Sequence, residues 1–232
     1  MTNRQARQER QRAKAKKGQY QWLIYMGIGA VILVGLIVLS QLFSGPRQTT
    51  YTQKDGMQLG AADAPVTVIE FLDFQCPHCL NSYNSVEEDM IAEYVDTGKV
   101  RLMYYVVGFL GPESVNSAEA AYCAAAQNYF WEFHDVVFAP VNFSNGNVGG
   151  YSDAKLIDMA GKVAGMDTQA FSACMASDEK IPEVQAAHDV AASLGVSGTP
   201  AFVINGQVLG GAQPFSRLQQ VIEEALETAG AN

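Results

Sequence analysis

Two cysteines three positions apart are the residues most able to do chemistry, in the stretch FLDFQCPHCLNSY at 71–83. Thiols at this spacing can clamp a metal ion, form a static bridge or exchange disulfides with other proteins. Cys76 directly precedes a predicted helix, whose free N–H groups and dipole favour a negatively charged sulfur at that position. Pro77 suits the first helical position because it has no N–H group to leave unpaired. The context therefore predicts that Cys76 is a reactive thiolate.

His78 and Cys79 complete the motif and favour disulfide exchange. A protonated His78 would place a cation close to Cys76, and that charge, like the helix terminus, lowers the pKa of a thiol. Stabilising the thiolate stabilises the dithiol form, so the disulfide passes readily to another protein. Cys79 lies one helical turn later, where it can resolve a mixed disulfide, and we expect it to be the less exposed cysteine. Cysteine chemistry performs this whole reaction, so no cofactor is required.

Cys123 and Cys174 leave further alternatives open. They could complete a tetrahedral zinc site with the CPHC pair, but neither belongs to a second closely spaced pair and both fall in predicted helices. The interpretation we favour is a structural disulfide between them, at a separation of 51 positions (174 − 123). By the chain-entropy estimate such a bridge contributes about 4 kcal/mol. A redox relay is the remaining alternative.

The elements around the CPHC motif predict a β-α-β unit. The run VTVIEFLDF at 66–74 is almost continuously β-branched, aliphatic or aromatic, as in a strand buried on both faces. Apolar residues then recur near helical spacing from Leu80 to Tyr94, and Gly98 ends that helix. The segment VRLMYYVV at 100–107 predicts a second strand, parallel to the first.

The rest of the chain predicts a helical block and a closing β-β-α unit. Segments of helical character fill a region from about 112 to 195. Two short strands follow in TPAFVINGQVLGG, joined by the hairpin signal Asn205-Gly206, and an amphipathic helix runs from about 215 to 229. A β-α-β half and a β-β-α half separated by a helical insertion resemble an α/β thioredoxin fold, which we expect over residues 65–232.

The first 64 residues predict a membrane anchor and its flanks. Seven of the 15 Lys and Arg residues fall among the first 17, within a basic tail over 1–21. Residues 22–43 carry no charge, and at 1.5 Å each they span about 33 Å, enough to cross a hydrocarbon core. This run exceeds a signal-peptide core and no A-x-A site directly follows it, so we expect one retained transmembrane helix. Residues 44–64 are expected to be a polar linker.

The distribution of charge indicates where the folded domain lies and what it does not bind. Beyond the tail, eight basic residues (15 − 7) face 23 acidic ones (24 − 1), which argues against nucleic acid as a partner. Positive charge before the span and almost none just after it places the N-terminus in the cytoplasm. We therefore expect a single-pass cell-membrane protein with an extracytoplasmic catalytic domain, a setting that favours disulfides over zinc thiolates.

Together these motifs resemble the DsbA-like thiol–disulfide oxidoreductases. The resemblance rests on CPHC after a strand, a Thr-Pro pair before a hairpin strand and the helical insertion, and it covers residues 57 to the end. GTPAFVINGQ and FWEFHDVVFA are similar to segments of the membrane-anchored members. Anchored members commonly carry a second, structural bridge, which is what we expect of Cys123 and Cys174.

The resemblance also implies roles for residues outside the motif. Thr199 and Pro200 would form the cis-proline loop that lies against the reactive disulfide and helps to position a bound peptide. Glu70 would be a buried acid that helps proton transfer at Cys79. The alternative for Glu70 is an edge or solvent-facing carboxylate, which is less expected inside so apolar a strand.

The function implied is the donation of disulfides to unfolded or reduced secreted and cell-envelope proteins. Re-oxidation would come from a quinone-linked membrane partner of the DsbB or vitamin K epoxide reductase type. Two alternatives stay open: an extracytoplasmic reductase or isomerase that uses the same pair, and a non-catalytic tethered binding module with a static bridge. The dipeptide Pro-His favours the oxidising direction, and the sequence shows no added dimerisation domain of the kind that isomerases of this fold usually carry.

Overall fold

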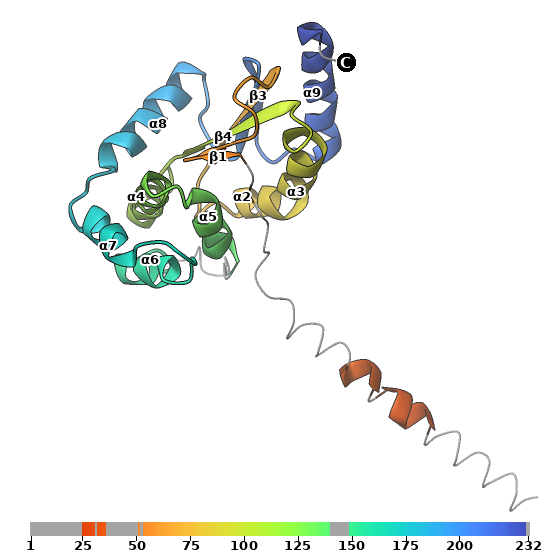
Figure 1. The fold of residues 1–232 in the computed structure, drawn as a ribbon, viewed down its shortest axis with the longest axis vertical. Helices are drawn as coiled ribbons and strands as arrows, with labels where there is room; N and C mark the ends of the chain where they lie inside the picture. The colour runs from red at the N-terminus through yellow and green to blue at the C-terminus, as the bar shows by residue number, and fades with distance from the viewer. Residues whose placement is uncertain (1–24, 31, 36–50, 52, 140–148, 231–232) are drawn as a thin grey trace, which may run out of the picture. The chain divides into compact units, whose positions relative to one another are not determined.

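The computed structural model describes residues 25–30, 32–35, 51, 53–139 and 149–230 (Figure 1). The chain divides into two compact units, 1–48 and 49–232. The described residues of the first unit are helical and exposed. None of the helices in the described ranges combines the length and the apolar character of a membrane span. The basic tail 1–21 and much of the expected span 22–43 lie outside the described residues, so both stay predictions.

A six-stranded mixed sheet forms the centre of the second unit, in the order β1-β2-β4-β3-β5-β6. Its central strand β3 (Val66–Leu72) pairs in parallel with β4 (Val100–Val106) and antiparallel with β5 (Ala201–Ile204). The predicted turn Asn205-Gly206 leads from β5 into β6 (Gln207–Gly210). β3 is buried along most of its length because strands lie on both sides of it and helices cover both faces. The predicted thioredoxin plan is confirmed.

The strands β1 (Lys54–Asp55) and β2 (Gln58–Leu59) correct the predicted start of the domain. β2 pairs antiparallel with β4, so part of the expected linker 44–64 is an edge of the sheet. Tyr51 is only 8% exposed, and its ring packs against Trp131 with 5.1 Å between the centroids. The prediction failed here because strands of two residues are too short to show an alternating pattern.

The helices fall where the sequence places them. The run after the motif consists of α2 (Pro77–Ser82), the π-helical η1 (Tyr83–Glu87), α3 (Glu88–Met90) and the π-helical η2 (Ile91–Val95). The insertion contains α4 (Pro112–Ala126), α5 (Phe130–Phe138), α6 (Asp153–Ala160), α7 (Thr168–Ala176) and α8 (Ile181–Ser193). The described chain closes with α9 (Phe215–Ala229).

Different helices cover the two faces of the sheet, with α8 and α9 on opposite sides (Figure 1). On one face, Phe71 packs in a buried cluster with Ala187 of α8. On the other face, Val68 and Leu72 pack in a cluster that includes residues of the run from α2 to η2 and of α9. Because successive side chains of a strand point to opposite faces, Glu70 lies on this second face, with the helix that carries the CPHC motif.

Candidate active site

Cys76 occupies the N-cap position of α2, and Pro77 is the first helical residue. The Cys76 N–H donates to the Asp73 carbonyl at 2.9 Å, and the Cys76 carbonyl accepts from the Cys79 N–H at 3.0 Å. Cys76 and Cys79 are both free thiols, at 6% and 2% exposure. The reactive sulfur therefore lies at the helix N-terminus, where the helix dipole favours negative charge.

The loop before β5 lies directly against Cys76. The Thr199–Pro200 peptide bond is cis. The Cys76 sulfur lies 3.2 Å from the Thr199 carbonyl, to which it can donate a hydrogen bond when protonated, across 123 positions of sequence. This contact follows from the sheet, because β5 pairs with β3 and β3 leads into the motif. The structure thus places the Thr199–Pro200 loop against Cys76, as the family resemblance implies.

The surroundings of Cys76 lower the pKa of its thiol from an ordinary 9.0 to about 5. The largest contribution is a hydrogen bond from the Cys79 thiol. Burial opposes it, because burial disfavours a charged sulfur, while the Thr199 side chain and the N–H groups of Cys79 and His78 lower the pKa further. The donors around the sulfur outweigh its desolvation, so Cys76 is a thiolate at neutral pH.

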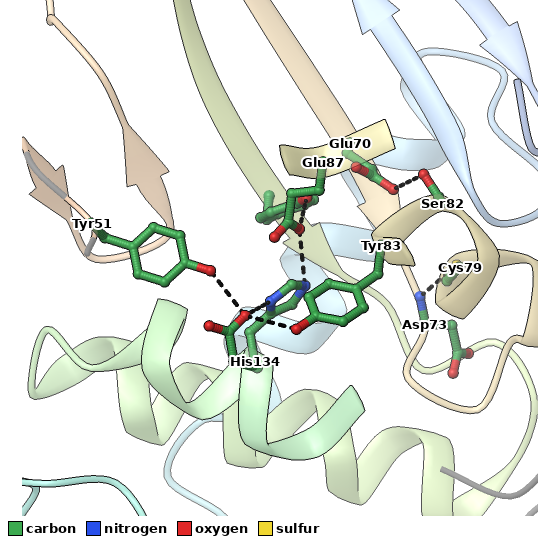
Figure 2. A network of polar contacts seen from close by, with 10 residues as sticks. Tyr51, Glu70, Asp73, Cys79, Ser82, Tyr83, Glu87 and His134 are labelled. Atoms are coloured by element: carbon green, nitrogen blue, oxygen red, sulfur yellow. Dashed lines mark hydrogen bonds and ion pairs between the residues drawn. The ribbon is translucent and has the colours of Figure 1, made fainter. Parts of the chain in front are cut away.

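Cys79 has the opposite character. Burial, together with the hydrogen bond and the negative charge of Cys76, raises the pKa of the Cys79 thiol well above 9.0. The Asp73 N–H donates to the Cys79 sulfur at 3.5 Å (Figure 2). One thiol of the pair is therefore ready to exchange with an outside thiol, whereas the other keeps its proton until a mixed disulfide must be resolved.

His78 has an exposed side chain, and its backbone N–H helps to lower the pKa of Cys76. A backbone donor aimed at a buried sulfur is little screened by solvent. The predicted effect of a protonated ring stays a prediction.

Glu70 lies in the interior, at 5% exposure. The Ser82 hydroxyl, about one turn after Cys79 on the same helix, donates to Glu70 Oε1 at 3.3 Å (Figure 2). Burial, followed by the nearby charge of Glu87, raises the pKa of Glu70 from 4.5 to about 8. The alternative of an edge or solvent-facing carboxylate is therefore wrong. Glu70 can hold or release a proton close to neutral pH.

Asp73 is a site residue that the sequence analysis missed. It is fully buried, and its carboxylate accepts from the Gln75 N–H at 2.8 Å and from the Phe109 N–H at 2.9 Å. The Ser114 hydroxyl of α4 donates to the same carboxylate. Asp73 therefore ties the active-site loop to the loop that enters the helical insertion. The available signal was a carboxylate at the end of an otherwise apolar run.

Cys123 of α4 and Cys174 of α7 are joined by a disulfide, with their Cα atoms 6.0 Å apart. The bridge fastens two helices of the insertion to each other, and Cys123 is only 1% exposed. The zinc alternative needed these sulfurs as free ligands beside the CPHC pair, so it is wrong.

Glu87, His134 and Asp135 are a buried group in the described part of the chain whose possible metal-ligand atoms lie within 4.8 Å of one another. The two carboxylates, however, contact opposite nitrogens of the ring: Glu87 Oε2 lies 3.4 Å from Nε2 and Asp135 Oδ1 lies 3.5 Å from Nδ1. A metal ion takes one nitrogen of an imidazole, whereas a protonated ring presents an N–H to each side. The arrangement fits a charged histidine between two acids better than a metal centre.

Known proteins resemble this chain in sequence and in fold. The sequence matches the thioredoxin family over residues 52–224. It is 30% identical over 212 residues to the "Probable disulfide bond formation protein D" of Bacillus anthracis, and the matched region covers 88% of this chain and 94% of that protein.

Solved structures give the same result. Oxidised BdbD from Bacillus subtilis superposes with a TM-score of 0.69 at 23% identity, over 76% of this chain and 96% of that one. A thioredoxin-like oxidoreductase from Silicibacter pomeroyi superposes with a TM-score of 0.60 at 27% identity, over 76% of this chain and 99% of that one. The chain therefore belongs to the thioredoxin family, as one of its DsbA-like thiol–disulfide oxidoreductases.

Proposed function

We propose that this chain introduces disulfide bonds into secreted or cell-envelope proteins through the Cys76–Cys79 pair. The observation that carries the proposal is the opposite behaviour of the two thiols, since the pKa of Cys76 is lowered to about 5 and that of Cys79 is raised. At pH 7 a shift from 9.0 to about 5 stabilises the dithiol form by about 2.7 kcal/mol, equivalent to about 60 mV. A stabilised dithiol makes the disulfide a ready donor.

Disulfide donation starts when a substrate thiolate attacks the Cys76 sulfur of the oxidised pair. The bond between Cys76 and Cys79 breaks, and Cys79 takes a proton from Glu70 as it leaves. A second substrate thiolate then attacks the substrate sulfur of the mixed disulfide. Cys76 leaves as a thiolate, which its low pKa favours, and the substrate carries the new disulfide.

Thr199 and Pro200 would position the substrate peptide. The Thr199 carbonyl lies 3.2 Å from the Cys76 sulfur, so a peptide bonded to Cys76 must run along this loop. Phe109 and Leu110 add apolar surface close by, because they are 37% and 55% exposed and the Phe109 N–H contacts Asp73 beside the motif. Exposed apolar side chains suit unfolded proteins, whose own apolar residues are accessible.

The test is disulfide transfer from the oxidised full chain to reduced, unfolded ribonuclease A, followed by thiol titration. We expect the wild-type chain to transfer one disulfide per molecule and Cys76→Ala to transfer none. The Cys79→Ala variant, after its Cys76 has been converted to a mixed disulfide with a small thiol, should accumulate a mixed disulfide with the substrate. A chain that reduces substrate disulfides faster than it forms them would be a reductase. If the wild-type chain transfers no disulfide and the Cys76→Ala variant binds the substrate as tightly as the wild type, the chain would be a binding module.

The proposal places the catalytic domain outside the cytoplasm on a retained anchor over 22–43, with the N-terminus in the cytoplasm. Three observations support it: the uncharged run itself, the basic tail 1–21, and the bridge between Cys123 and Cys174, which suits an oxidising compartment. In bacteria without a cell wall, added protease should digest the domain and spare a tag at the N-terminus. Digestion of that tag, or release of the chain by alkaline carbonate, would contradict the anchor.

Repeated turnover requires re-oxidation, for which we propose a quinone-linked membrane partner of the DsbB or vitamin K epoxide reductase type. In this direction the Cys76 thiolate attacks the partner's disulfide, and Cys79 passes its proton to Glu70 and closes the bond. Membranes that contain such a partner and a quinone should re-oxidise the wild-type chain but not Cys79→Ala. Equal rates in membranes with and without the partner would contradict this assignment.

A further inference from the structure

Buried polar side chains gather around Glu70 in the interior, beside the active-site helix (Figure 2). We call these side chains the polar network: Cys79 and Ser82 of α2, Tyr83 and Glu87 of η1, Tyr104 of β4, His134 and Asp135 of α5, and Tyr51 before β1. All of these side chains are buried. Charges in such a place must be balanced by one another, because water does not reach them.

Tyr104 links Glu70 to Glu87. Glu70 and Tyr104 are register partners on β3 and β4, so their side chains share one face of the sheet. The Tyr104 hydroxyl donates to Glu87 Oε2 at 2.7 Å, and it also lowers the pKa of the Glu70 carboxyl, as a donor within reach of that group does. A phenol has a single proton, so it cannot donate to two ionised carboxylates at once. The carboxylate that lacks this donor is stabilised by keeping a proton of its own.

His134 balances the charge on the other side of Glu87. Its ring lies between Glu87 and Asp135, with a contact to one carboxylate from each nitrogen. Asp135 has donors of its own, because the hydroxyls of Tyr51 and Tyr83 donate to its Oδ1 at 2.8 and 3.3 Å. The charge that Glu70 experiences from this side is therefore that of Glu87, reduced by the positive ring of His134.

We propose that Glu87 and His134 are positioning residues which set, through Tyr104, whether Glu70 holds a proton. The inference rests on the proposed function in one respect, namely that Glu70 exchanges a proton with Cys79. With the Tyr104 hydroxyl on Glu87, Glu70 keeps its proton and is ready to protonate the departing Cys79 thiolate. Without the charge of Glu87, Glu70 takes the hydroxyl and ionises at lower pH.

The proton stays within the network in both directions of the reaction. During disulfide donation it moves from the Glu70 carboxyl to the Cys79 sulfur, and the Tyr104 hydroxyl turns to the new Glu70 carboxylate. During re-oxidation it returns from Cys79 to Glu70, and the hydroxyl turns back to Glu87. No outside acid or base is consumed, and the electrons move only in the thiol–disulfide exchange itself.

The test is an infrared titration of the reduced full chain that follows the C=O band of the protonated Glu70 carboxyl, assigned by its loss in Glu70→Gln. Glu87→Gln should move the midpoint of this band to lower pH by about one to two units, the usual size of the effect of a neighbouring like charge on a buried carboxyl. His134→Gln should move the midpoint to higher pH, because it leaves two carboxylates without their counter-charge.

Glu119→Gln is the matched control, since it removes a buried carboxylate of α4 that is 3% exposed and takes no part in the contacts of the network. It should leave the midpoint unchanged. A shift with Glu87→Gln smaller than about half a unit overturns the proposal, and so do shifts of the same sign in the two variants. If His134→Gln does not fold, Glu87→Gln decides alone. The band reports the proton on Glu70 whether or not the chain transfers disulfides, so failure of the proposed function would be seen separately.

Discussion

Replacing Cys79 with alanine should raise the pKa of Cys76. The hydrogen bond from the Cys79 thiol is the largest of the effects that lower this pKa to about 5. Alanine removes that donor but keeps the helix N-terminus and the backbone N–H groups that also face Cys76. The variant therefore separates the part of the thiolate stabilisation that comes from the second cysteine from the part that comes from the backbone.

The expected size follows from the strength of such a bond. A hydrogen bond to a charged group contributes about 1.5–3 kcal/mol, and one pKa unit corresponds to about 1.4 kcal/mol. Loss of the bond should therefore raise the pKa of Cys76 by about one to two units, to about 6–7. Cys79→Ser keeps a hydroxyl donor, so its pKa should lie between those of the wild-type and Cys79→Ala chains.

The measurement is the pH dependence of thiolate absorbance, checked by the rate of alkylation with iodoacetamide. In Cys79→Ala the signal belongs to Cys76 alone, because Cys123 and Cys174 are bonded to each other. A pKa that stays within about half a unit of the wild-type value would refute this reasoning. It would assign the stabilisation to the helix N-terminus and the backbone instead.

Three further predictions follow from other contacts. A double variant with alanine in place of both Cys123 and Cys174 should have a free energy of unfolding about 4 kcal/mol lower in denaturant titrations. The alkylation rate of Cys76 should not change. A free energy of unfolding equal to that of the wild type would show that the bridge does not restrain the insertion. Asp73→Asn should lower the free energy of unfolding by about 2 kcal/mol in the same titrations, because an amide cannot accept all the hydrogen bonds of the carboxylate. An unchanged denaturation midpoint would contradict this prediction. The reduced chain should be more stable than the oxidised chain, by a margin that grows by about 1.4 kcal/mol per pH unit between about pH 5 and 9 and vanishes as the pH falls through 5. The reason is that the Cys76 thiol binds more protons in the unfolded chain than in the folded chain within that window. Urea titrations of both forms that give a constant difference in the free energy of unfolding would contradict this prediction.

The core of the site was predictable from local sequence. Cys76, Pro77 and Cys79 are read correctly because the strand before them and the helix after them are both strongly patterned, and these elements fix where the sulfurs lie. The Thr199–Pro200 loop could be assigned only through the family resemblance, which rests in part on a Thr-Pro pair before a hairpin strand. The burial of Glu70 follows from its place in an apolar strand.

The rest of the site depends on contacts between distant segments. Three different elements carry Glu87, Tyr104 and His134, and Tyr51 precedes β1, so only the packed fold brings their polar groups together. Taken alone, each is an unremarkable residue in a strand, helix or loop. The contribution of the His78 backbone N–H was equally hard to predict, because it depends on how the first turn of α2 is placed against the Cys76 sulfur. The sequence pattern therefore predicts helices and strands, whereas the balance of charges in the core depends on which segments pack together in the folded structure.

The reduction potential of the Cys76–Cys79 pair tests the central proposal most directly. It would be measured on the full chain by equilibration with glutathione buffers, with the two redox forms separated after alkylation. A value near that of the strong oxidant DsbA, about −120 mV, is the result that disulfide donation predicts. A value near that of thioredoxin, about −270 mV, would contradict the proposed direction and make the chain a reductase.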